Sequence, residues 1–123
     1  MTVSDRVGID TTGMTNHDHI TIEWAPFRVR AGVTDAELRA AAAAIQDEFL
    51  ARQPGFLRRE LLAGDDGGYV DVLWWQDRRS AQAAMEQVAG SAACSRYFAL
   101  MDGDAQAGAG VQHLAQLASY RGP

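Results

Sequence analysis

The stretch Asp71-Val72-Leu73-Trp74-Trp75-Gln76-Asp77 (DVLWWQD) decides the fold of this chain. Its apolar, aromatic and β-branched residues predict a strand. Successive side chains of a strand point to opposite faces of the sheet, so Trp74 and Trp75 must point in opposite directions. The fold therefore has to provide an apolar neighbour on both faces of this strand.

The sequence on either side of this strand predicts the element order β-α-β-β-α-β. Strands are expected at residues 19–30, 56–63, 69–76 and 111–120, and the first helix at 34–52. Thr34 and Glu37 form a capping-box pattern, and Pro54-Gly55 ends that helix. Ser80 or Asp77 caps the second helical region, which Gly90-Ser91 interrupts. The loop 64–68 (GDDGG) is typical of a hairpin.

This order is the split βαβ arrangement, which gives a ferredoxin-like α+β fold with a four-stranded antiparallel sheet and helices on one face. Val70, Val72 and Trp74 share one face of the third strand, Tyr69, Asp71, Leu73 and Trp75 share the other, and helices can cover only one of these two faces. Soluble monomers rarely expose an apolar face of this kind, so a second copy of the chain is expected to cover the remaining one. The predicted organisation is a leader at 1–18, one domain at 19–120 and a tail at 121–123.

Composition excludes several classes of function. A net charge of −5 and a pI near 5.0 argue against a nucleic-acid partner. No apolar run approaches the ~18 residues of a membrane span, and residues 1–18 lack the apolar core of a signal peptide. The single cysteine, Cys94, fits a cytoplasmic location. The chain has no lysine, which excludes Schiff-base chemistry on a lysine.

Several landmarks resemble the dimeric α+β barrel superfamily, in particular the antibiotic biosynthesis monooxygenase-like proteins. The matching pieces are Gln53-Pro54-Gly55-Phe56, Tyr69-Val70-Asp71-Val72 followed by Trp74-Trp75, Ser80-Ala81-Gln82-Ala83-Ala84, and Cys94-Ser95-Arg96-Tyr97-Phe98. The resemblance covers residues 19–120. It is specific for the fold and weak for the activity, because this fold hosts several functions.

The resemblance implies a homodimer with an apolar pocket between sheet and helices in each subunit. In cofactor-free members such a pocket serves the oxidation of aromatic substrates by O2. Some of these members and the haem degraders use an asparagine near the pocket, and the haem degraders place an axial histidine in a helix. The only asparagine here is Asn16, and the predicted helices contain no histidine. Haem degradation is therefore disfavoured, and no cofactor is expected.

A group of large apolar side chains is the candidate binding site for a flat apolar ligand. Its members are Trp24, Phe27, Trp75, Tyr97, Phe98 and Cys94. Rings with polar edges suit a cleft, although the same residues, like Trp74, also serve as ordinary core between sheet and helices. Cys94 lies one helical turn from Tyr97, and inert packing is the competing interpretation for its thiol.

The candidate catalytic residues are His113 and Asp71. An imidazole is suited to removing an acidic phenolic or enolic proton, although a strand histidine is more often a structural donor. If Glu60 stands opposite Asp71, crowding would favour a proton shuttle. The alternative is an ion-pair network of Glu23, Arg58, Glu60 and Asp71 across a dimer interface. His17 and His19 lack a third ligand, so no metal is expected.

Two functions follow from these residues. The first is a cofactor-independent monooxygenase that acts on a small aromatic or polycyclic compound. The alternative is a non-catalytic, small-molecule-binding or stress-related dimer that uses the same pocket without chemistry. Oxygen uptake with quinol or anthrone substrates would separate them.

Overall fold

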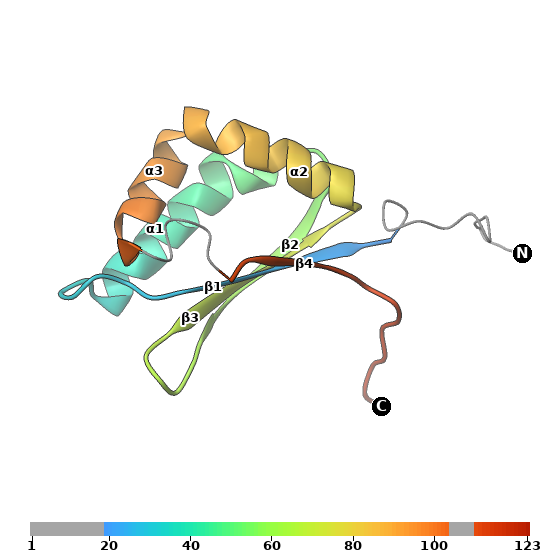
Figure 1. Cartoon of the computed structure of the whole chain (residues 1–123), viewed down its shortest axis with the longest axis horizontal. Coiled ribbons are helices and arrows are strands. Elements are labelled where there is room, and N and C mark those ends of the chain that lie inside the picture. The colour runs from blue at the N-terminus through green and yellow to red at the C-terminus, as the bar shows by residue number, and fades with distance from the viewer. Residues whose placement is uncertain (1–18, 104–109) are drawn as a thin grey trace, which may run out of the picture.

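A computed structural model describes residues 19–103 and 110–123, and Figure 1 shows its helices packed together over one face of a sheet. The strands are β1 (Thr21–Phe27), β2 (Phe56–Ala63), β3 (Tyr69–Trp75) and β4 (Gln112–Ala115). The α-helices are α1 (Asp35–Glu48), α2 (Arg78–Gln87) and α3 (Ala92–Ala99), with short 3-10 turns η2 (Leu50–Arg52) and η3 (Val88–Gly90). This is the predicted ferredoxin-like α+β fold. The predicted leader at 1–18 lies outside the described residues.

Side-chain caps begin the helices α1, α2 and α3. The Thr34 hydroxyl accepts from the Glu37 amide, and the Glu37 carboxylate accepts from the Thr34 amide, which completes the predicted capping box of α1. Asp77, rather than Ser80, caps α2 through the Ser80 amide. Ser91 caps α3, as expected where Gly90-Ser91 interrupts the second helical region.

The sheet has the strand order β2-β3-β1-β4, and its paired strands are antiparallel. β1 is central, yet it contains Pro26, which cannot donate a backbone hydrogen bond. Pro26 pairs with Val70 of β3, whereas β4 pairs only with Thr21 to Trp24. The proline therefore lies beyond the end of β4, where its missing amide leaves no ladder bond unmade. β4 is shorter than the predicted strand at 111–120.

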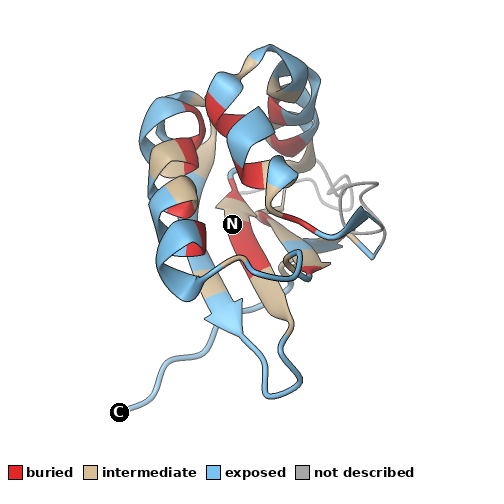
Figure 2. Cartoon of the chain, turned by 90° about the vertical axis from the view of Figure 1, so that its left-hand side faces the viewer, coloured by how far each residue is buried: buried red, intermediate tan, exposed pale blue. Residues whose placement is uncertain are grey.

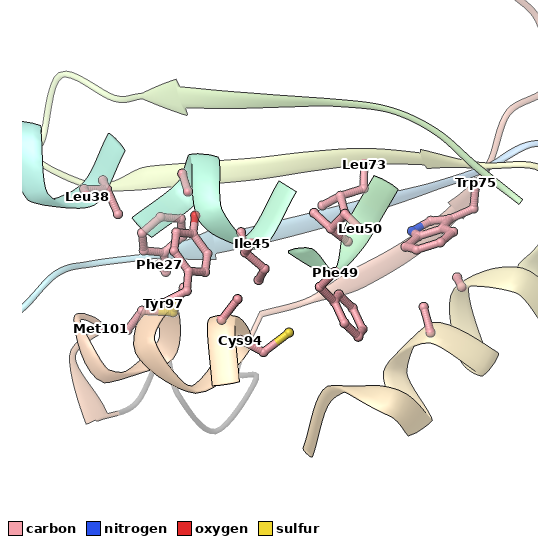
Figure 3. Packing of buried hydrophobic residues seen from close by; sticks show 14 residues of the cluster. Phe27, Leu38, Ile45, Phe49, Leu50, Leu73, Trp75, Cys94, Tyr97 and Met101 are labelled. Carbon is pink, nitrogen blue, oxygen red and sulfur yellow. The ribbon is translucent and has the colours of Figure 1, made fainter. Parts of the chain in front are cut away.

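Trp74 and Trp75 occupy opposite faces of the sheet, as predicted. Trp75 is almost completely buried under the helices, whereas Trp74 faces away from them and is half-buried. In Figure 2 the buried residues line the space between helices and sheet. In Figure 3 Trp75 lies at one end of this core, and Tyr97 and Phe27 lie at the other. Ile45, Phe49, Leu50, Leu73 and Cys94 lie between them.

The register between β2 and β3 decides whether Glu60 stands opposite Asp71, the condition for a pair of crowded carboxylates. Glu60 pairs with Val72, and Asp71 pairs with Leu61, so Glu60 does not stand opposite Asp71. The hairpin closes through Gly64 and Gly68, and the pairing differs by one residue from the one that would place the two carboxylates opposite each other. Glu60 therefore lies on the outer face of the sheet, and the proposed pair of crowded carboxylates does not form.

Candidate functional site

A cavity of about 610 Å³ lies between the helices and the sheet. Its volume is within the range of small-molecule sites. Apolar side chains from β1, β3, α1, α2 and α3 form most of its wall. The charged or polar side chains in this wall are Glu23, Arg59, Asp71, Tyr97 and His113. An apolar wall with few polar groups suits a flat, largely apolar ligand that carries one or two polar substituents.

Arg59, Asp71 and Tyr97 form a buried network on the cavity wall. The Arg59 Nε and Nη2 atoms donate to Asp71 at 2.8 and 3.3 Å, and Arg59 Nη1 donates to the Ala42 carbonyl at 2.8 Å. The Tyr97 hydroxyl donates to Asp71 Oδ2 at 2.5 Å. The Arg59 and Asp71 side chains are only 7% and 9% exposed. Because donors already engage both Asp71 oxygens, this carboxylate joins β2, β3 and α3.

The electrostatics of this network fix the charge states of its donors. Burial raises the pKa of the Tyr97 hydroxyl far above its usual value, and the negative charge of Asp71 adds to this effect. Burial opposes the charge of Arg59, but its hydrogen bond and charge interaction with Asp71 outweigh burial, so the pKa of Arg59 is raised. Tyr97 is therefore a neutral donor and Arg59 a cation across the physiological pH range.

A second polar group lies where β1 meets β4. Glu23 and His113 are paired positions of these strands, and their side chains are 16% and 21% exposed. The Trp75 indole N–H donates to Glu23 Oε1 at 3.2 Å. His113 Nε2 lies 3.5 Å from the same oxygen. Within the part of the chain that the structure describes, this buried nitrogen has no hydrogen-bond partner.

The structure brings most of the predicted site residues to the cavity. Phe27, Trp75, Tyr97, Phe98, Cys94, Asp71 and His113 all line it. The prediction that Trp24 lines the pocket is wrong, because Trp24 pairs with Val72 on the outer face of the sheet and is 39% exposed. Burial raises the pKa of the Cys94 thiol, which favours inert packing for this residue.

Glu23 and Arg59 line the cavity without having been predicted as site residues. The sequence predicted Glu23 only as a member of an ion-pair network of strand charges. Residues an even number of positions apart on a strand share a face, and this alternation could have identified Glu23. Glu23 shares its face with Thr21 and Phe27, which are both buried beneath the helices. Arg59 likewise shares a face with Leu73 and Trp75 through its register with β3.

Among residues 19–103 and 110–123, no three histidine, cysteine, aspartate or glutamate side chains gather as a metal site would require. The helices of this same part of the chain are all too short or too polar to cross a membrane.

These features define a ferredoxin-like α+β protein with a ligand-sized apolar cavity beneath its helices. No protein-family model and no curated protein sequence matches the chain. Among solved structures, SnoaB, a cofactor-independent oxygenase from Streptomyces nogalater, is 27% identical with a TM-score of 0.59. The match covers 86% of this chain and 98% of SnoaB. An asparagine-to-alanine variant of SnoaB matches equally over the same shares, with a TM-score of 0.58.

Two further structures carry names of antibiotic biosynthesis monooxygenases. One, from Caulobacter crescentus, is 16% identical over 84% of this chain and 94% of that chain, with a TM-score of 0.62. The other, from Bordetella bronchiseptica, is 20% identical over 81% of this chain and 99% of that chain, with a TM-score of 0.59. At these identities the likeness shows a shared fold. Together with SnoaB, they confirm the resemblance to antibiotic biosynthesis monooxygenase-like proteins.

Proposed function

We propose that the protein is a cofactor-independent monooxygenase that oxidises a small aromatic or polycyclic compound bound in the cavity. The observation that carries this proposal is the placement of His113 beside the Glu23 carboxylate in a mostly apolar wall. The 27% identity to SnoaB over nearly the whole of that chain supports it. Phe27, Trp75, Tyr97 and Phe98 would contact the rings of the substrate.

In this proposal His113 is the general base. It removes an acidic proton from the substrate, and the electron pair stays on the substrate as an anion. The anion reduces O2 directly; one oxygen atom enters the product and the other leaves as water. Asp71 is engaged by Arg59 and Tyr97, so its role is to hold these two side chains in the wall. The substrate supplies the electrons, so the proposal needs no resident cofactor.

Oxygen uptake on a panel of anthrones and hydroquinones tests this function. We expect one O2 to be consumed per product formed and, with ¹⁸O2, one labelled oxygen atom in the product. Treatment with a chelator should leave the rate unchanged. Quenching of tryptophan fluorescence by these compounds without any oxygen uptake would overturn the proposal and favour a non-catalytic binding protein.

We further propose that the outer face of the sheet binds a second copy of the chain. This face is apolar across all four strands; its members are Ile22, Trp24, Leu62, Val70, Val72, Trp74 and Leu114. Arg58 pairs with Glu60 on the same face and lies 4.3 Å from the centre of the Trp74 ring. An apolar face that carries one ion pair suits a symmetric contact between two copies of the chain, in which the ion pair of each copy helps to orient the other.

Replacing Trp74 by glutamate is expected to separate the dimer. Burial of one large aromatic side chain stabilises by about 2–3 kcal/mol and occurs twice in a symmetric dimer, so the dissociation constant should rise roughly a thousandfold or more. Sedimentation at micromolar concentration measures this change. Gln82→Glu adds the same charge to the exposed surface of α2 and should leave the dimer intact. A monomeric wild-type protein would contradict the proposal.

A further inference from the structure

Glu23 is a mostly buried carboxylate on the floor of the cavity, and the proposed reaction does not yet use it. It projects from β1 towards the helices between its neighbours Leu73 of β3 and His113 of β4. Its Oε1 atom accepts from the Trp75 indole and lies 3.5 Å from His113 Nε2. Three side chains from three adjacent strands therefore meet at one carboxylate oxygen.

We propose that Glu23 is the positioning residue of His113: it orients the imidazole and balances its charge once the ring has taken a proton. A carboxylate with little access to water is stabilised only in part by one neutral indole donor. An imidazolium beside it would supply the positive charge that balances the carboxylate. Its Nε2–H could donate to the carboxylate, and in the described structure Nε2 has no hydrogen-bond partner. The inference rests on the proposed function, which makes His113 the base.

The proton balance is simple. An O–H or activated C–H bond of the substrate breaks, its electron pair stays on the substrate, and the proton goes to the His113 ring. The ring becomes cationic beside the Glu23 carboxylate, so a carboxylate next to a neutral ring becomes an ion pair, and the new positive charge has a partner within the apolar wall. Removing the negative charge of Glu23 would therefore slow the proton transfer without changing the shape of the cavity.

Other charged or titratable side chains of the cavity wall do not compete with Glu23 for this role. Arg59 of β2 and Asp71 of β3 are bonded to each other. Tyr97 and Cys94 of α3 have raised pKa values because of burial, so both stay protonated in the working range. Among the described residues, Glu23 is the carboxylate that lies within 4 Å of a His113 nitrogen.

The Trp75 indole gives a readout of this arrangement that does not depend on activity. Its N–H donates to the oxygen that faces His113, so its ¹H–¹⁵N resonance should move, as the pH is varied, when the His113 ring gains or loses its charge. We expect this movement in the wild type and its loss in both Glu23→Gln and His113→Gln. A Trp75→Phe variant assigns the resonance, and the indoles of Trp24 and Trp74 on the outer face should not move.

Kinetics supply the second measurement. The carboxamide of Glu23→Gln can still accept from the Trp75 indole, so the fold should be kept while the charge is lost. We expect kcat to fall about tenfold or more with KM unchanged within about threefold, and the acid limb of the pH–rate profile to shift. Glu23→Asp should recover part of the rate. The exposed carboxylate of Glu86, on α2, is the control, and Glu86→Gln should behave as wild type.

The two measurements separate failure of this inference from failure of the proposed function. If the protein takes up no oxygen, the proposed function is wrong, but the pH response of the Trp75 indole still tests the pairing of Glu23 with His113. A wild-type indole that does not respond to pH, or a response that persists in Glu23→Gln, overturns the role of Glu23. The same conclusion follows if Glu23→Gln turns over at the wild-type rate.

Discussion

Replacing His113 by alanine is expected to lower kcat by about 10²–10⁴-fold, the range that a well-placed general base contributes. The affinity for the substrate should change little, because aromatic and apolar side chains form most of the wall. Stopped-flow or oxygen-electrode kinetics measure the rate, and quenching of tryptophan fluorescence measures binding. Added imidazole should restore part of the turnover, since it can enter the space that the side chain leaves.

The matched control for His113 is its neighbour Gln112, which lies on the same strand but faces away from the cavity. Gln112→Ala should keep the wild-type rate. If His113→Ala also keeps that rate within about threefold, His113 is not the base. If the His113→Ala variant is less stable in urea unfolding and imidazole does not restore its turnover, His113 is a structural donor.

Replacing Asp71 by leucine is expected to lower the free energy of unfolding by about 3–5 kcal/mol. The substitution leaves the Arg59 charge buried without its partner and removes the acceptor of the Tyr97 hydroxyl. Urea denaturation measures the change. A second substitution, Arg59→Met, should restore part of the loss in the double variant, because an apolar pair of similar volume leaves no stranded charge.

An exposed ion pair provides the comparison for Asp71. Arg39 and Asp35 pair at 2.6 Å one turn apart on α1, with side chains that remain largely in water. Asp35→Ala should therefore cost less than about 1 kcal/mol. Equal losses for Asp35→Ala and Asp71→Leu would show that the buried network does not contribute more than a surface pair.

Local sequence signals predicted the fold well. The alternation around Trp74 and Trp75, the capping residues Thr34 and Glu37, and the Pro54-Gly55 turn each act within a few residues. Gly55 shows that local signals do not explain every residue of the turn, because a contact with a distant residue also requires glycine there. Its φ of 83° suits glycine, and a side chain there would overlap Ser80, a residue 25 positions further along the chain.

The candidate site was harder to predict because it depends on register and on which face of the sheet lies under the helices. Ile22 and Trp24 form the more apolar face of β1, yet the helices cover the face with Glu23. A sheet with two apolar faces gives no local sign of which one is inside. In the same way, a shift of one residue in the hairpin decides whether Asp71 faces Glu60 or Leu61.

The guanidinium of Arg59 has a consequence for how the domain opens. It bonds a carbonyl of α1 and a carboxylate of β3, and that carboxylate in turn holds Tyr97 of α3. Detaching any one of these elements would leave a charge or a donor unsatisfied in an apolar interior. Backbone amides in α1, β3 and α3 should therefore exchange with deuterium at a common free energy, as a single cooperative unit rather than helix by helix.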